Sequence, residues 1–284
     1  PLRNVVAAMR DIIKTNDLSK RVDIIYKDET GELAHSFNLM TGELQKAYEQ
    51  IKGYALKAVV AQHKEQKIRN IFQKYVPKDV IDQFFTNPEA MLVGEDRELA
   101  VLFSDIRSFT TISEQLLPNE LVESLNNYFS RMVEIIMERN GIVDKYIGDA
   151  IMSFFGAPVK HEDDALQATY AALEMIESLN QFNKTQQEAG RPEFKIGIGI
   201  NYGLVTVGNI GSERKMDYTV IGDMVNLASR LEGLTKKYGE PLIVSESVYN
   251  QIADNLHCRL VDKVIVKGKS RAIGIYSPTR SEEH

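Results

Sequence analysis

The sequence predicts an α+β domain with a mixed or antiparallel sheet, preceded by a helical N-terminal segment. Two observations support this prediction. From residue 95 onward, short β-rich runs alternate with amphipathic helices, and hairpins occur among them. The earlier part of the chain is poor in glycine and repeats its apolar residues in a heptad pattern. We therefore expect the structure to change between residues 78 and 95.

The N-terminal segment is expected to contain two helices joined by a connector over residues 15–27. The first helix carries Val5, Met9, Ile12 and Ile13 on one side. The second follows a heptad seam typical of a coiled coil. The seam consists of Leu33, Phe37, Met40, Leu44, Ala47, Ile51, Tyr54, Ala58 and Ala61, and after Glu65 it resumes with Ile68, Phe72 and Tyr75. Its length and small alanine positions favour dimerisation over the alternative, one amphipathic helix packed on its own domain.

The remainder is expected to begin with a buried strand, LAVLFSDI, followed by a helix over residues 118–139 that ends before Gly141. The run IVDKYIGDAIMSFF predicts a hairpin that turns at Gly148 and Asp149. Later elements follow the same periodicity rules. They are a helix over 163–188, the strands FKIGIGINYG, LVTVGNIG and DYTVIG, a helix over 223–238, a strand over 242–244, a helix from Ser245, and strands over 259–267 and 272–276.

Composition excludes several classes of protein. The net charge of −6 argues against a nucleic-acid binder, which normally has a basic face. A single cysteine, Cys258, rules out a disulfide within the chain and indicates a reducing cytoplasmic compartment. No apolar run reaches the roughly 18 residues that span a bilayer, so we expect a soluble fragment. The start at Pro1, within helix-like sequence, suggests a piece of a longer protein.

Two aspartates are the first candidates for chemistry. Asp105 ends the first buried strand, and Asp149 lies at the hairpin turn. A carboxylate among apolar residues costs several kcal/mol unless it is paired or binds a cation. Brought together by adjacent strands, the two would form a hard anionic site suited to Mg²⁺. The alternative is that each aspartate caps a turn or a helix.

Basic and polar residues supply further candidates. Asn226 and Arg230 are four apart on a helix and project from one face, where they could hold a ribose and a phosphate, although an ordinary solvated face is the alternative. Lys145 and Thr219 come from strands and could read the edge of a base. Weaker candidates for binding polyphosphate are Lys267 and Arg214. A P-loop, a dinucleotide-binding glycine motif, zinc-ligand spacing and a serine-hydrolase elbow are all absent from the sequence.

Taken in order, FSDIRSFT, DKYIGDAIMSFFGAP, GIGINYGLVTVGNIGSERKMDYTVIGDMVNLASRLE and VKGK closely resemble the catalytic domain of class III nucleotidyl cyclases over residues 95–278. This resemblance implies a ferredoxin-like fold. Residues 1–52 resemble a HAMP domain, which relays signals from a membrane segment. Residues 53–94 look like a coiled coil and short transducing helix, and residues 279–284 form a tail.

The resemblance also implies roles for individual residues. Asp105 and Asp149, assisted by the backbone of Ile106, would bind two divalent metal ions, Mg²⁺ or Mn²⁺. The nucleotide-binding roles cover the base, the ribose and the phosphates. Lys145 and Thr219 would select adenine, Asn226 would orient the ribose, Arg230 would stabilise the transition state, and Lys267 and Arg214 would hold the β- and γ-phosphates.

We therefore expect an adenylate cyclase that converts ATP to cyclic AMP and pyrophosphate at shared sites in a homodimer. It would be the cytoplasmic portion of an inner-membrane protein whose sensor segment lies upstream. The alternatives are a guanylate cyclase, which usually carries Glu at the position of Lys145 and Cys at that of Thr219, and a silent nucleotide-binding relay module. A diguanylate cyclase would require a GGDEF motif, which is missing. Many adenylate cyclases carry Asp at the position of Thr219, and the bacterial subgroup with Thr includes bicarbonate-responsive enzymes, so bicarbonate stimulation is a further hypothesis.

Overall fold

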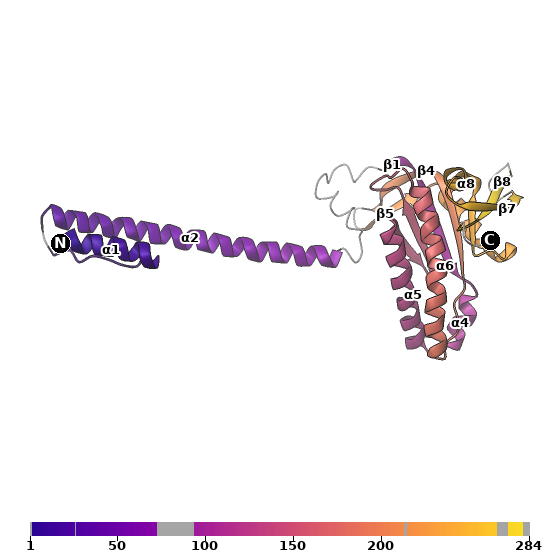
Figure 1. Cartoon of the computed structure of the whole chain (residues 1–284), viewed down its shortest axis with the longest axis horizontal. Coiled ribbons are helices and arrows are strands. Elements are labelled where there is room, and N and C mark those ends of the chain that lie inside the picture. Colours follow the sequence, from indigo (N-terminus) through magenta and orange to yellow (C-terminus); the bar gives the residue numbers. More distant parts are fainter. Residues whose placement is uncertain (1, 26, 73–93, 213–214, 266–271, 281–284) are drawn as a thin grey trace. The chain divides into compact units, whose positions relative to one another are not determined.

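The computed structural model describes residues 2–25, 27–72, 94–212, 215–265 and 272–280. The chain divides into two compact units, Pro1–Tyr75 and Val76–His284, which are shown in Figure 1. Within the predicted coiled coil and transducing helix of residues 53–94, residues 73–93 lie outside the described residues. We describe each unit separately.

The N-terminal unit is a pair of helices, α1 (Leu2–Thr15) and α2 (Glu29–Phe72). The predicted connector between them is confirmed. A small apolar core, made by Val5, Val22, Ala34 and Phe37, joins the helices and the connector. Asn38 holds the connector in place, because its side-chain amide both donates to and accepts from the backbone of Val22 at 2.8 Å.

Several residues of the predicted heptad seam are exposed in this single chain. Phe37 is 4% exposed, whereas Met40, Ile51 and Tyr54 are 50%, 65% and 69% exposed. Helix α2 also runs without a break through residue 52, where the sequence suggested a domain boundary. Dimerisation through this seam remains a prediction. Among the described residues, no helix combines the length and apolar character needed to cross a bilayer.

The second unit is built on an eight-stranded sheet with the order β2-β3-β1-β4-β6-β8-β7, in which β5 also pairs with β4. Strands β4 and β6 are parallel and the other pairs are antiparallel, which confirms the predicted mixed sheet. The strands are β1 (Glu95–Ile106), β2 (Ile142–Ile147), β3 (Ala150–Phe155), β4 (Ile196–Ser212), β5 (Lys215–Ile221), β6 (Leu242–Ser245), β7 (His257–Val264) and β8 (Ile273–Thr279).

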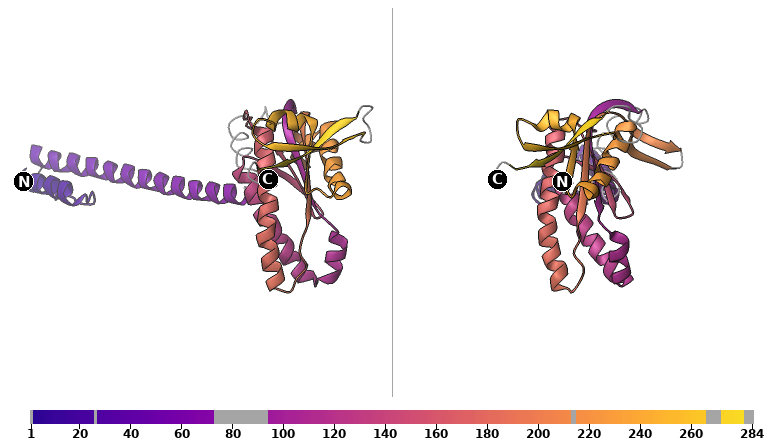
Figure 2. Two further views of the ribbon diagram at one scale, coloured as in Figure 1. Left: turned by 45° about the vertical axis from the view of Figure 1, so that its right-hand side comes forward. Right: turned by 90° about the vertical axis from the view of Figure 1, so that its right-hand side faces the viewer.

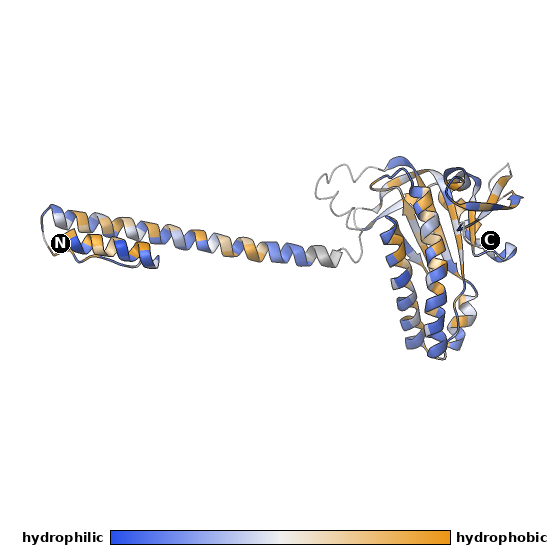
Figure 3. Cartoon of the chain, viewed as in Figure 1, coloured by the Kyte–Doolittle hydropathy of each residue, from blue (hydrophilic) through white to orange (hydrophobic). Residues whose placement is uncertain are grey.

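Helices cover both faces of the sheet. Helices α5 (Pro118–Glu138), α6 (Asp164–Glu188) and α8 (Glu246–Ile252) pack on one face, around a core that includes Tyr128. Helix α7 (Asp223–Tyr238) covers the other face. Figures 1 and 2 show α5 and α6 running side by side, and Figure 3 shows hydrophobic and hydrophilic patches alternating along them. In this arrangement the C-terminal end of β1 lies close to the C-terminal end of α7.

The structure corrects two details of the predicted fold. The runs FKIGIGINYG and LVTVGNIG are a single strand, β4, whose pairing with β1 continues from Glu95↔Val207 to Ile106↔Ile196. Gly203 is therefore not a turn, and a Cβ added there would meet the side chain of Met224 at 3.0 Å. The short helix α4 (Phe109–Gln115) was not predicted, because its seven residues are too few for a clear periodicity.

Glycines in β4 allow α7 to pack closely on the sheet. Gly197 and Gly199 alternate with the buried Ile196, Ile198 and Ile200, so they share the face that α7 covers. A Cβ at Gly199 would lie 2.5 Å from the carbonyl oxygen of Ala228 on α7. The backbones of strand and helix are thus nearly in contact at this position.

Candidate active site

Adjacent strands bring the two predicted metal-binding aspartates together. Asp105 is the penultimate residue of β1, and Asp149 lies in the turn between β2 and β3. Strands β1 and β3 are antiparallel with Ser104 opposite Ile151, so the end of one strand meets the start of the other. Gly148 supplies the positive φ of 67° that a tight two-residue hairpin turn requires.

The two carboxyl groups interact directly. Burial, followed by a hydrogen bond and charge repulsion from Asp149, raises the pKa of Asp105 to about 6. The backbone N–H of Ile106 donates to Asp105 Oδ1 at 3.1 Å and partly opposes this rise. Two carboxyl groups in hydrogen-bonding contact cannot both ionise at low cost unless a cation lies between them. The pair is therefore a favourable place for a positive ion.

The chemistry of the donor set suits Mg²⁺ or Mn²⁺. Asp105, Asp149 and the backbone carbonyl of Ile106 offer oxygen ligands alone, which these hard cations prefer. Within the described ranges, no group of three or more His, Cys, Asp or Glu side chains is arranged to hold a metal. A bound ion would thus need further oxygen ligands from water or from the phosphates of a substrate.

A third acid, Glu232 on α7, was missed in the sequence. Burial and then the charge of Asp105 raise the pKa of Glu232 to about 7, with a smaller contribution from Asp149 and an opposing one from Arg107. The sequence held a signal, because Ala228, Leu231, Glu232 and Thr235 are spaced as one face of a helix, and an acid is unexpected on a face that also carries apolar residues.

Arg107 ties the end of β1 to the end of α7. Its guanidinium donates to the backbone carbonyls of Thr235 at 3.2 Å and Glu240 at 2.6 Å. Its Nε is buried and has no hydrogen-bond partner among the residues that the structure describes. The arginine therefore fixes the position of Glu232 beside the aspartate pair as well as partly balancing its charge.

The predicted base-reading residues form a second cluster, centred on Asp144, which was not among the predicted site residues. Thr219 on β5 donates its hydroxyl proton to Asp144 Oδ2 at 2.5 Å. Lys145 Nζ lies 3.4 Å from Asp144 Oδ1. Burial raises the pKa of Asp144, while Thr219 and Lys145 oppose that rise. An acidic residue is unusual within a strand, so the dipeptide Asp144-Lys145 was a usable signal.

Helix α7 carries the remaining two described candidates on its outward side. Asn226 is exposed and Arg230 is partly exposed, whereas Leu227, Ala228 and Leu231 are buried. The predicted spacing of four residues on one helix face is confirmed. Asn226 and Arg230 thus project away from the sheet that carries Asp105.

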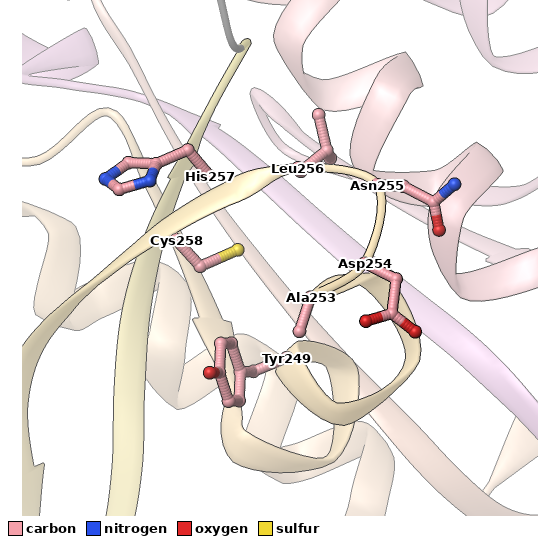
Figure 4. A pocket seen from close by; sticks show the side chains of 7 residues that line it. All are labelled: Tyr249, Ala253, Asp254, Asn255, Leu256, His257 and Cys258. Carbon is pink, nitrogen blue, oxygen red and sulfur yellow. The ribbon is translucent and has the colours of Figure 1, made fainter.

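The other two phosphate-binding candidates, Arg214 and Lys267, lie outside the described residues. A pocket elsewhere in the unit contains none of the described candidates. It is lined by the end of α8 and the start of β7, including Tyr249, Asp254 and Cys258, as Figure 4 shows. Burial raises the pKa of the Cys258 thiol, which keeps the thiol in its unreactive protonated form at neutral pH.

Comparisons with known proteins identify the families that both parts of the chain resemble. Residues 93–277 match the family of adenylate and guanylate cyclase catalytic domains, and residues 1–46 match HAMP domains. An adenylate cyclase of Anabaena cylindrica is 38% identical over 275 residues, which cover 93% of this chain and 51% of that protein. The chain thus spans about half the length of this relative, and it spans less of several others.

Two solved structures resemble the chain to a similar degree. The adenylyl cyclase CyaB from P. aeruginosa matches with a TM-score of 0.64 and 37% identity, covering 68% of this chain and 98% of that one. The guanylyl cyclase Cya2 matches with a TM-score of 0.61 and 37% identity, covering 67% and 95%. Overall similarity therefore does not distinguish the two nucleotides, and the residues that face the base must do so.

Proposed function

Since this chain belongs to the family of adenylate and guanylate cyclase catalytic domains, with a HAMP domain before it, we propose that it is an adenylate cyclase that converts ATP to 3′,5′-cyclic AMP and pyrophosphate. The observation that carries the proposal is the contact between Asp105 and Asp149. This contact depends on the register of β1 and β3, which brings the end of β1 next to the β2–β3 turn. The adenylate cyclases among its relatives support the same activity.

In this proposal the two aspartates and the Ile106 backbone hold two divalent ions, Mg²⁺ or Mn²⁺. Bound there, the ions would supply Lewis-acid chemistry, lowering the pKa of the ribose 3′-hydroxyl and neutralising phosphate charge. By holding these ions, Asp105 and Asp149 would place positive charge where the triphosphate binds, which in-line attack of the 3′-oxygen on the α-phosphorus requires. Lys267 and Arg214 are proposed to hold the β- and γ-phosphates.

The base is proposed to be adenine because of Lys145 and Thr219. The Lys145 ammonium donates to the N1 acceptor of adenine, whereas the protonated N1 of guanine would oppose it. Thr219 offers a hydroxyl to the 6-amino group. The guanylyl cyclase among the structural relatives makes a guanylate cyclase the second candidate. The charge on Lys145 weighs against that alternative.

Asn226 and Arg230 complete the proposed mechanism. Asn226 orients the ribose, and Arg230 meets the negative charge that develops in the transition state, where a fixed cation is worth most. Both side chains project away from the sheet that carries the aspartate pair. We therefore propose that two copies form a homodimer, in which one copy supplies the acids and its partner supplies Lys145, Thr219, Asn226 and Arg230.

Regulation is proposed to enter through the N-terminal unit. A HAMP domain relays signals from a membrane segment, so we place the chain in the cytoplasmic portion of an inner-membrane protein. The exposed residues along α2 would form the parallel coiled coil of the dimer. A small rotation of this coil would change the separation of the two half-sites, to which catalysis is sensitive.

The experiment that tests the proposed function is product analysis after incubation of the purified chain with ATP or GTP, each with Mg²⁺ or Mn²⁺. Cyclic AMP and pyrophosphate in equal amounts from ATP are the expected result. Cyclic GMP as the main product would instead establish the second candidate. Asp105→Ala and Asp149→Ala are the matched negative controls, and loss of product in both would tie the activity to this site.

A further inference from the structure

Asp144 occupies an irregular position in the sheet, which explains how it reaches two other residues. The pairing of β2 with β3 changes from Val143↔Ser153 to Lys145↔Met152, so Asp144 is the extra residue of a β-bulge. Bulges redirect side chains and are frequent beside active sites. Here the bulge turns the side chains of Asp144 and Lys145 toward the same region, which neighbouring residues of a regular strand would not share.

The contacts of Asp144 separate its two oxygen atoms by function. Oδ2 accepts the Thr219 hydroxyl proton at 2.5 Å across 75 residues of sequence. Oδ1 lies 3.4 Å from Lys145 Nζ but has no hydrogen-bond partner among the described residues. The side chain of Asp144 is 1% exposed, so water does not compete for these contacts. The 3.4 Å contact engages one side of the Lys145 ammonium, which carries three N–H donors and so retains donors for a substrate.

We propose that Asp144 is a positioning residue for base selection, because it takes the Thr219 proton and leaves that hydroxyl with only lone pairs to present to the substrate. A threonine hydroxyl is ordinarily both donor and acceptor, and so accepts either a 6-amino or a 6-oxo purine. With its proton committed to Asp144, Thr219 accepts a hydrogen bond from the 6-amino group of adenine and opposes the 6-oxygen of guanine. This inference rests on the proposed function and deepens it.

The substitution Asp144→Asn reverses the hydrogen bond while preserving the shape of the side chain. The Lys145 ammonium is a donor, so the amide oxygen of the asparagine will face it. The amide NH₂ will then face Thr219 and donate to its oxygen, which frees the hydroxyl proton to point at the base. The variant should therefore lose its preference for a substrate with a 6-amino group.

The test compares ATP with purine riboside triphosphate, which lacks only the 6-amino group and keeps the N1 acceptor. Assays are run at pH 8, well above the ordinary pKa of a carboxyl group. We expect kcat/KM for the wild-type chain to favour ATP at least about tenfold, the value of one good hydrogen bond. In Asp144→Asn the ratio should fall to about threefold or less. The matched control is Asp96→Asn, because Asp96 accepts from Thr206 at 2.7 Å in the same way but is exposed; its ratio should not change.

A double-mutant cycle separates positioning from a general loss of structure. Thr219→Val should lower the ratio as much as Asp144→Asn, and combining the two should lower it no further. If Asp144→Asn does not fold, Thr219→Ser and Thr219→Val decide: serine keeps the hydroxyl and must keep the preference, and valine must lose it. A serine variant that behaves like valine would overturn the inference.

The two possible failures are distinguishable. If the wild-type chain makes cyclic AMP but Asp144→Asn retains the full tenfold preference, or if the double variant is additive, the positioning role is wrong and the proposed function stands. If the wild-type chain makes no cyclic AMP from ATP, the proposed function is wrong and the positioning role is overturned with it.

Discussion

The carboxyl groups of Asp105, near the end of β1, and Asp149, in the turn between β2 and β3, lie against each other. In the metal-free protein this contact is unfavourable, since burial and the second carboxyl hold the pKa of Asp105 near 6. In the metal-bound protein the same contact would become the binding site. The pair thus lowers the stability of the metal-free protein and raises its affinity for a cation, as is common for groups at functional sites.

Removing one acid should separate these two effects. Asp149→Asn should raise the melting temperature in EDTA at pH 8, because the repulsion is gone. It should also abolish the increase in melting temperature that Mn²⁺ gives the wild-type chain, because a ligand stabilises only the fold that binds it. Thermal melts with and without Mn²⁺ measure both. Asp254→Asn, on the exposed segment after α8, is the control and should keep the Mn²⁺ response.

The shared-site proposal predicts complementation between two inactive variants. Asp105→Ala should be nearly inactive because it loses a metal ligand, and Arg230→Ala should lose about 100-fold or more in kcat because it loses transition-state stabilisation. Mixed and allowed to exchange subunits, they should recover part of the activity, because one hybrid site keeps both sets of residues. Cyclic AMP formation measures the recovery. No recovery, with heterodimers demonstrated by two affinity tags, would refute sharing between subunits.

Glu232 should make the stability of the metal-free protein depend on pH. Its folded pKa of about 7 lies above the ordinary 4.5, so the folded chain holds the proton more tightly than the unfolded chain. Stability is then lost as pH rises from 4.5 to 7 and stays lower above 7. Glu232→Gln removes this loss and should melt higher than wild type at pH 8 in EDTA, by roughly 2–4 °C for an effect of about 1 kcal/mol after solvent screening.

The expected gap between Glu232→Gln and wild type is small at pH 5 and grows toward pH 8, where it levels off. Glu188→Gln, at the exposed end of α6, is the matched control and should follow wild type at every pH. A gap of the same size at pH 5 and pH 8 would mean that the glutamate acts through packing and not through its charge.

Sequence alone was sufficient for the features that depend on local pattern. The hairpin that carries Asp149 follows from two β-rich runs around a glycine, and its contact with Asp105 follows from adjacent strands. The spacing of Asn226 and Arg230 follows from helical geometry.

What could not be predicted depends on contacts between distant segments. The bond from Thr219 to Asp144 requires a bulge in β2 and the approach of β5, neither of which has a distinct local signal. Glu232 becomes part of the acidic cluster only because α7 crosses the end of β1. Gly203 resembles a turn residue in sequence but is needed inside a strand for the close approach of Met224.

The close packing of α7 on β4 also gives the last prediction, at Gly199. A Cβ there would collide with the backbone N of Glu232 and lie 2.5 Å from the carbonyl oxygen of Ala228, so Gly199→Ala must push α7 off the sheet. Overpacking of this kind costs about 1–3 kcal/mol. Because α7 also carries Asn226 and Arg230, displacement should lower kcat together with the melting temperature. Gly233→Ala is the matched control: a Cβ at that position on α7 meets nothing within 4 Å, and alanine favours the helix. Gly233→Ala should therefore keep wild-type activity and melt no lower than wild type, and if Gly199→Ala did the same, the packing of α7 on β4 would not control the site.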